Sequence, residues 1–457
     1  MFEKQYTSEK SYVLKDLTII STNGTIINIY PQMIELSIFE DIYNSTISGH
    51  IVMSDSQDLF NRIPLSGFEF ISIVVGKPGS SREVVFEKIF RIYKMTGGEV
   101  KAATTSNQVY MLHFCSEENI ISVSRRISKS YRGKTTSDIV RDILVNQLAV
   151  SSKKLLSRNI ENTSGIHDII IPYMNPLAAI TWLAARTVSA SQKSSGANYM
   201  FYENTEGYNF KSLETLFQKP TKAKYSYKAK NIDFPDDNSV SEIQDVIKYE
   251  FMDNFDILSG ISSGMFSSVL KGVDLTRLQV NDSVMNYSKF FESSMHVEKK
   301  NAFQFQNEYE DRLKNKIHEN YFSVMRMYPT NRTHDVNSNI ASKQPSIKQN
   351  LVENWLLQRI TQISQLNYFK LKMVIPGDTY LTIGDIIEFN LPLVSIKNPG
   401  ESNINPFYSG RYLVTAIRHK MDYQSYEMII EATRDCLSAT YPDAKNSDAG
   451  IKEIKKL

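Results

Sequence analysis

Near the start of the chain the sequence reads IELSIFE at residues 34–40 and SGHIVMS at residues 48–54. Apolar and polar residues alternate in both stretches, a pattern typical of strands with one buried face. Similar stretches follow, namely FEFISIVV at 68–75, FEKIFRIYKM at 86–95 and VYMLHFC at 109–115. Polar turn sequences separate these stretches, most clearly the Pro-Leu-Ser-Gly run that ends at Gly67. Several short strands in series predict a small barrel or sandwich over residues 1–116.

Residues 117–236 have a different character and predict an α+β domain. Residues 117–130 can be helical, and Thr136 or Ser137 can cap a further helix with apolar residues at helical spacing. Asn175 and Pro176 form a helix start, with Asn as the cap and Pro at the first helical position. Residues 199–210 fit a β-hairpin that turns at a glycine.

The β pattern returns in two segments, residues 237–284 and 364–440, which we expect to form a second β domain. Strands are predicted at 369–375, 379–383, 386–390, 410–420 and 423–432. Residues 285–363 are polar and Asn-rich and predict an insertion with helices, including an amphipathic helix near 351–363 and a long loop at 329–345. Residues 441–457 predict a polar C-terminal tail. The expected fold class is therefore α+β, mostly β.

Composition limits the possible functions. The chain has 457 residues, and its 52 Lys and Arg nearly balance its 50 Asp and Glu. This balance gives no electrostatic signature of general nucleic-acid binding. The two cysteines, Cys115 and Cys436, match no disulfide framework and are expected to be reduced and buried. The polar N-terminus does not fit a secretion signal, and no apolar run is long enough for a membrane span.

The sequence offers no convincing catalytic or cofactor site. Its seven histidines are scattered, without the spacing that places two metal ligands on one helical face. A nucleophile-elbow pattern occurs at residues 260–264, but its flanks favour a turn between strands. We therefore expect no enzymatic activity, no cofactor and no metal. A basic cluster that could contact an acidic neighbour is more simply a solvated helix face; it comprises Arg125, Arg126, Lys129, Arg132 and Lys134.

Three groups of segments, taken together, resemble one protein family. The first group is residues 34–43, 48–55 and 63–69; the second is 131–140, 171–176 and 199–213; the third is 369–378, 381–389 and 409–414 with His419. In order and spacing they resemble the central baseplate hub protein of contractile-tailed bacteriophages, which is related to the hub part of type VI secretion spike proteins. The resemblance covers most of the chain, whereas 285–348 has no counterpart in it.

This resemblance implies two tube-like β-barrel domains in each chain, at 1–116 and at 237–284 with 364–440. It also implies a homotrimeric, pseudo-sixfold ring that joins the sixfold tail tube to the threefold central spike and lets genomic DNA pass. The implied partners are the spike, the tail tube or tube-initiator proteins and possible baseplate wedge proteins, without stable membrane association. The implied location is the tail baseplate of the virion, after synthesis in the host cytoplasm.

Two loops between the predicted tube-domain strands are candidate contacts with neighbouring rings. Their residues are Asn44, Ser45, Thr46 and Gly49 in the first loop, and Pro376, Gly377, Asp378 and Tyr380 in the second.

Two other classes of protein compete with this interpretation. A tail-associated cell-wall hydrolase would need a catalytic motif in a convincing context. A glycan- or receptor-binding β protein would need exposed tryptophans, but Trp182 and Trp355 both lie on predicted helices and are better explained by core packing.

Overall fold

The computed structural model describes most of the chain. The described residues are 13–55, 65–76, 84–97, 108–191, 197–227, 245–254, 256–275, 278–303, 317–330, 352–366, 369–378, 380–393, 404–423 and 425–439. Of the loop predicted at 329–345, Pro329 and Thr330 end a strand and residues 331–345 lie outside the described residues, as does the tail predicted at 441–457.

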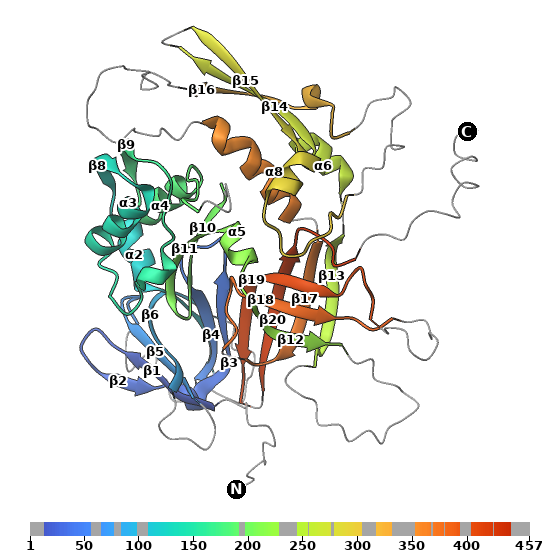
Figure 1. The fold of residues 1–457 in the computed structure, drawn as a ribbon. Helices are drawn as coiled ribbons and strands as arrows, with labels where there is room; N and C mark the ends of the chain where they lie inside the picture. Colours follow the sequence, from blue (N-terminus) through green and yellow to red (C-terminus); the bar gives the residue numbers. More distant parts are fainter. Residues whose placement is uncertain are drawn as a thin grey trace.

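One large sheet runs through the molecule and contains strands from both ends of the chain (Figure 1). Its order is β13 (Lys248–Asn254), β17 (Phe369–Pro376), β20 (Tyr426–Arg434), β19 (Gly410–Met421), β3 (Met33–Asp41), β4 (Ser48–Asp55), β7 (Gln108–Cys115), β6 (Val84–Gly97), β5 (Phe70–Gly76), β1 (Val13–Ile20) and β2 (Ile26–Asn28). In addition, β12 (Thr221–Ser226) runs parallel to β18 (Ile386–Asn390), which pairs with β19.

The N-terminal half of this sheet, β1 to β7, has its own core. Alternate residues of β4 and β5 are buried, as the sequence pattern predicts. Their inward side chains pack with those of β3, β6 and β7. The residues of this shared core include Leu36, Ile38, Ile51, Ile73 and Phe114. We call this part the first β region.

The C-terminal half, β12, β13 and β17 to β20, surrounds a second core. This core includes Leu371, Ile386, Leu413 and Ile430. An isolated bridge between Ser226 and Asp245 brings the end of β12 next to the residues that precede β13. The two outermost strands of this region therefore approach each other there. We call this part the second β region.

Strands β3 and β19 join the two β regions. They pair antiparallel from Ala416 opposite Asp41 to Met421 opposite Leu36. We call this pairing the seam. Because each strand also pairs with its own region, on β4 for β3 and on β18 and β20 for β19, the two regions share one continuous hydrogen-bonded sheet.

The α+β part lies between and above the β regions (Figure 1). It contains α2 (Glu117–Ser124), β8 (Ile127–Lys134), α3 (Thr136–Asp142), β9 (His167–Met174), α4 (Pro176–Ala184), β10 (Tyr199–Asn204), β11 (Gly207–Ser212) and α5 (Leu213–Phe217). A one-turn π-helix (Ile143–Gln147) continues α3. Strands β8 and β9 form one two-stranded sheet and β10 and β11 another.

Every residue of β10 is buried, because the hairpin packs against different neighbours on its two faces. Successive side chains of a strand point to opposite faces. Tyr199 and Phe201 pack into the α+β core, whereas Met200 and Tyr202 pack into the core of the second β region. The hairpin is therefore the central packing element of the chain.

The remaining elements form a separate layer. Strand β14 (Ser267–Asp274) pairs antiparallel with β15 (Gln279–Asn286) and parallel with β16 (Met325–Thr330). The helices α6 (Ile257–Ser263), α7 (Tyr287–Ser293) and α8 (Leu356–Leu366) lie beside this sheet (Figure 1). Thus β14, which lies within the segment predicted for the second β domain, pairs with β16 of the predicted insertion, and β15 joins this three-stranded sheet through β14. The domain boundaries themselves stay a prediction.

The fold class, α+β and mostly β, is confirmed. Among the described residues, no strand pairing closes either region into a barrel. The helix start at Asn175 and the hairpin after residue 199 are confirmed. Two local predictions are wrong: residues 127–130 belong to strand β8 and not to a helix, and the described residues 380–383 form a turn and not a strand.

Candidate functional site

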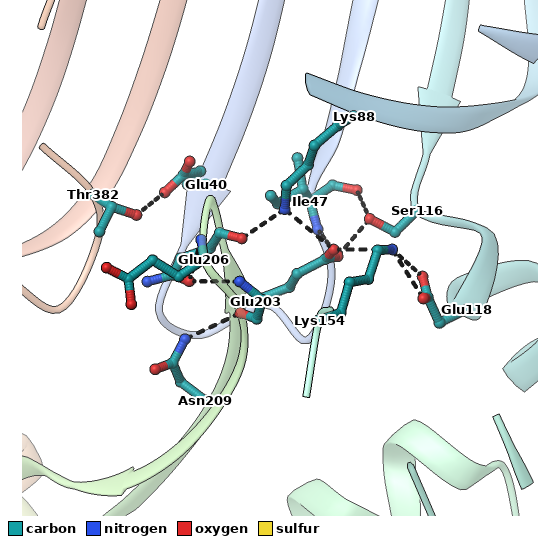
Figure 2. A network of polar contacts seen from close by, with 12 residues as sticks. Glu40, Ile47, Lys88, Ser116, Glu118, Lys154, Glu203, Glu206, Asn209 and Thr382 are labelled. Carbon is teal, nitrogen blue, oxygen red and sulfur yellow. Dashed lines mark hydrogen bonds and ion pairs between the residues drawn. The ribbon is translucent and has the colours of Figure 1, made fainter. Parts of the chain in front are cut away.

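A buried carboxylate lies where the hairpin meets the first β region. Glu203 is on β10, and its side chain is fully buried (Figure 2). Its Oε2 accepts a hydrogen bond from the backbone N–H of Ile47 at 3.1 Å and a second from the Ser116 hydroxyl. Ile47 precedes β4 and Ser116 follows β7, so one carboxylate binds two parts of the first β region.

Two lysines complete this cluster. Lys88 on β6 places its Nζ 3.5 Å from Glu203 Oε1 and donates to the Asn204 carbonyl at 2.6 Å. Lys154 places its Nζ 3.4 Å from Glu203 and 2.8 Å from Glu118 Oε2 on α2. We call Lys88, Glu118, Lys154 and Glu203 the four-charge joint; its two positive and two negative groups balance.

The local backbone positions Lys154. Gly207, at the hairpin turn, has φ +128°, a backbone conformation that glycine adopts readily and other residues rarely do. A Cβ on Gly207 would lie 2.1 Å from the Lys154 carbonyl oxygen. That carbonyl accepts a hydrogen bond from Tyr208 N at 2.9 Å. The glycine therefore allows the Lys154 backbone to approach the hairpin, which brings its ammonium group to Glu203.

Electrostatics keep the joint ionised. Burial raises the pKa of Glu203, but Lys88, Lys154 and the hydrogen bonds from Ser116 and Ile47 outweigh it, so the pKa lies below its ordinary value. Burial lowers the pKa of Lys154, but Glu203 and Glu118 outweigh it and the pKa is raised. Glu203 and Lys154 therefore each stay charged here because oppositely charged partners lie beside them.

Two further groups bind the second β region to its neighbours. Glu40 on β3 accepts a hydrogen bond from the Thr382 hydroxyl at 2.7 Å (Figure 2). It also lies 3.6 Å from His419 on β19, so its contacts cross the seam. Asp385, in the loop before β18, lies 3.3 Å from Lys219, which follows α5, and 2.6 Å from Lys222 on β12 of the same region.

A charged histidine connects the insertion to β20. His296 Nδ1 lies 2.6 Å from Asp435 Oδ2, and its Nε2 lies 3.0 Å from the Phe291 carbonyl. Both ring nitrogens thus face acceptors, which only the doubly protonated ring satisfies. Burial lowers the pKa of His296, but the charge of Asp435 and these hydrogen bonds outweigh it and raise the pKa above its usual value.

The predicted ring-contact residues fall into two environments. Asn44 and Tyr380 are exposed, and Ser45, Thr46, Pro376 and Asp378 are half-buried. Gly49 and Gly377 are buried; an added Cβ would lie 2.3 Å from the Phe114 ring and 2.0 Å from the Tyr426 ring, respectively. The Ser45 hydroxyl lies 3.5 Å from that of Thr181 on α4, so this loop also contacts the α+β part. Their role in ring contacts stays a prediction.

The turn between strands that the flanks of the nucleophile-elbow pattern favour is wrong for most of the segment, which is helical. Residues 260–263 belong to α6, and Gly264 ends it in the left-handed conformation. The Ser262 hydroxyl donates to the Ser259 carbonyl. Among the described residues, no group of three or more His, Cys, Asp or Glu side chains is arranged to hold a metal ion, and no helix is long and apolar enough to cross a membrane. Cys115 and Cys436 are both buried and unpaired.

Sequence reasoning missed the four-charge joint. The partners of Glu203 lie 49 to 156 residues away, and no motif spacing connects them. The available signal was weak: Glu203 and Asn204 follow a run of four apolar or aromatic residues in a predicted hairpin. A carboxylate at the end of such a strand suggests a buried polar contact but does not identify its partner.

Removing the central charge tests the joint. Glu203→Gln leaves Lys88 and Lys154 with an uncompensated buried charge, so we expect the free energy of unfolding to fall by about 3–5 kcal/mol. Glu206→Gln is the matched control on the same hairpin, because among the described residues the ion pair of Glu206 is an exposed one with Arg158, and its loss should cost about 1 kcal/mol or less. Urea denaturation of both variants measures the difference, and equal losses would contradict this account.

The raised pKa of His296 predicts a pH dependence. A group whose pKa is higher in the folded state stabilises the fold below its unfolded pKa, near 6.5, and loses that contribution as the pH rises through the folded value. We expect His296→Gln to cost about 1.5–3 kcal/mol at pH 6 and progressively less toward alkaline pH. His113→Gln is the control, since burial lowers the pKa of His113. A His296→Gln deficit that does not change with pH would contradict a charged histidine.

The fold is similar to that of solved tail proteins. No protein-family model matches the chain, and no curated protein matches it. The tail protein from Neisseria meningitidis MC58 has a TM-score of 0.52 and 11% identity, covering 94% of this chain and 99% of that one. The prophage MuSo2 43 kDa tail protein from Shewanella oneidensis has a TM-score of 0.52 and 9% identity, covering 93% and 100%. Over almost its whole length, the chain therefore has the fold of these two tail proteins.

Proposed function

We propose that this chain is a structural subunit of the central hub of a phage tail baseplate. Three copies form a pseudo-sixfold ring that joins the sixfold tail tube to the threefold central spike. Genomic DNA crosses the central opening without being held. In this role the chain catalyses no reaction and needs no cofactor.

The pairing of β3 with β19 carries this proposal. It places two β regions side by side in one sheet, at a relative position fixed by backbone hydrogen bonds. A single chain then offers two similar contact units, and three chains offer six. A closed ring needs the same rotation at each interface, so a fixed spacing within the chain favours closure.

The fold likeness supports the same role. It extends over nearly the full length of this chain and of both solved tail proteins. The charged groups described above also fit a load-transmitting subunit, because they fasten the parts of the chain to one another. The four-charge joint fixes the hairpin to the first β region, and Asp385 and His296 fasten the second β region to its neighbours.

The partners and location follow from this role. The subunit contacts two further copies of itself, the spike, and a tail-tube or tube-initiator protein, with wedge proteins as outer neighbours. It is made in the host cytoplasm and resides in the virion baseplate, without stable membrane association. The loops at Asn44–Gly49 and Pro376–Tyr380 contact the adjacent ring, with exposed Asn44 and Tyr380 the most accessible side chains in them.

The mass of the purified protein in solution tests the ring. We expect light scattering to give three times the 52.3 kDa of one chain, and negative-stain images of the same peak to show a central hole with a pseudo-sixfold outline. A monomer that persists at high concentration, and in mixtures with tail-tube and spike proteins, would contradict the proposal.

A further inference from the structure

The two-stranded sheet of β8 and β9 lies at the margin of the α+β part, away from the main sheet (Figure 1). One face of it is internal: Ile127, Tyr131 and Ile171 are buried in the α+β core. The other face is open to solvent. The strand register places Ser130 opposite Ile170 on this open side, and both residues are exposed.

The basic residues on and beside strand β8 divide into two groups. Arg125 donates to the Gln147 carbonyl at 2.7 Å, and Lys129 pairs with Asp142 at 2.7 Å. Arg126, Arg132 and Lys134 are exposed, and within the described part of the chain their side chains have no hydrogen bond or ion pair. Arg125 and Lys129 therefore have partners within the chain, whereas the side chains of the other three cations have no ion-pair partner among the described residues. One acidic group is close, Asp168, whose Oδ1 accepts a hydrogen bond from Gly133 N.

Two apolar side chains are exposed on the adjacent strand. Ile170 is 68% exposed and Tyr173 is 72% exposed, although both lie on β9. Tyr173 has φ +44°, a backbone conformation that costs free energy for a bulky residue. The chain therefore maintains a strained backbone that presents an aromatic ring to solvent. Strain of this kind is often found at binding sites, where the surrounding structure maintains it.

We propose that these five residues form a docking surface for an acidic protein segment that carries an apolar side chain. This surface, the basic β8–β9 face, consists of Arg126, Arg132, Lys134, Ile170 and Tyr173. The cations supply electrostatic complementarity to carboxylates, and Ile170 and Tyr173 supply the apolar contact that anchors interfaces. The surface goes beyond ring formation because it assigns a place and a chemistry to a partner of the subunit.

The chemistry of the face favours a protein over a nucleic acid. Non-specific binding of nucleic acid draws mainly on many cations that neutralise phosphates, whereas this face offers three and the charge of the whole chain is nearly balanced. An exposed isoleucine beside the cations adds nothing to a phosphate contact, but it does bury against an apolar side chain. The partner is therefore an acidic protein segment, and binding of DNA is the competing outcome.

Fluorescence anisotropy with the full-length protein tests the docking surface. The probe is a short labelled peptide of alternating Glu and Leu, compared with an all-Glu peptide, a peptide of alternating Lys and Leu, and a single-stranded DNA of equal charge. We expect the Glu-Leu peptide to bind most tightly. Arg132→Glu combined with Lys134→Glu should weaken that binding by about tenfold or more. The control is Lys153→Glu with Lys289→Glu, which makes the same charge change at two exposed lysines elsewhere.

A second variant separates binding from folding. Asn tolerates positive φ better than Tyr, so Tyr173→Asn should leave the melting temperature unchanged or raise it. It removes the aromatic ring and should weaken peptide binding by about fivefold or more. The proposal is overturned if the charge-reversal pair binds the peptide like its control, if Tyr173→Asn binds like the wild type, or if the DNA binds more tightly than the peptide. Peptide binding can be measured on a monomer or a trimer. Loss of the docking proposal is therefore distinguishable from loss of the proposed ring.

Discussion

The antiparallel pairing of β3 with β19 is the contact on which the rest of the structure depends. Without it, the chain would have two β regions with separate cores and no common sheet. The seam also brings residues from the two ends of the chain together, since Glu40 binds Thr382 across it. Backbone hydrogen bonds fix distance and register at once, because a slip by one residue would turn every side chain of β3 to the opposite face. A subunit that must present two contact units at a fixed spacing needs this kind of connection.

Buried charges reinforce the seam and make the arrangement specific. A charged group in the interior gains little net stability when paired, but it costs several kcal/mol when its partner is lost. The four-charge joint thus disfavours any arrangement in which the hairpin leaves the first β region, because Lys88 and Glu203 would each lose a buried charge partner. The aromatic residues of the hairpin fill two cores, and its one central carboxylate specifies where it docks. Apolar packing supplies most of the attraction, and the charges select the geometry.

Local pattern predicted local structure well and long-range pairing poorly. Alternation predicted β4 and β6, and the Asn-Pro pair predicted the start of α4, because these signals depend on neighbouring residues. The first half of β8, residues 127–130, was predicted as helix because its sequence ISKS has few apolar residues, whereas in the structure Ile127 and Tyr131 of this strand pack on the α+β core. Neither the pairing of β14 with β16 nor the partners of Glu203 leave a signal in spacing, since both join segments more than forty residues apart. The candidate site therefore required the structure.

Native-state hydrogen exchange across the seam tests the central claim most directly. If β3 and β19 form one continuous sheet, the paired amides between Leu36 and Asp41 and between Ala416 and Met421 should exchange only when the whole chain unfolds. Their opening free energy should then equal that of amides in the two cores, such as those of Ile51 and Ile430. If the seam amides exchange much faster while both cores stay protected, the β regions separate independently and the account of a single rigid subunit is contradicted.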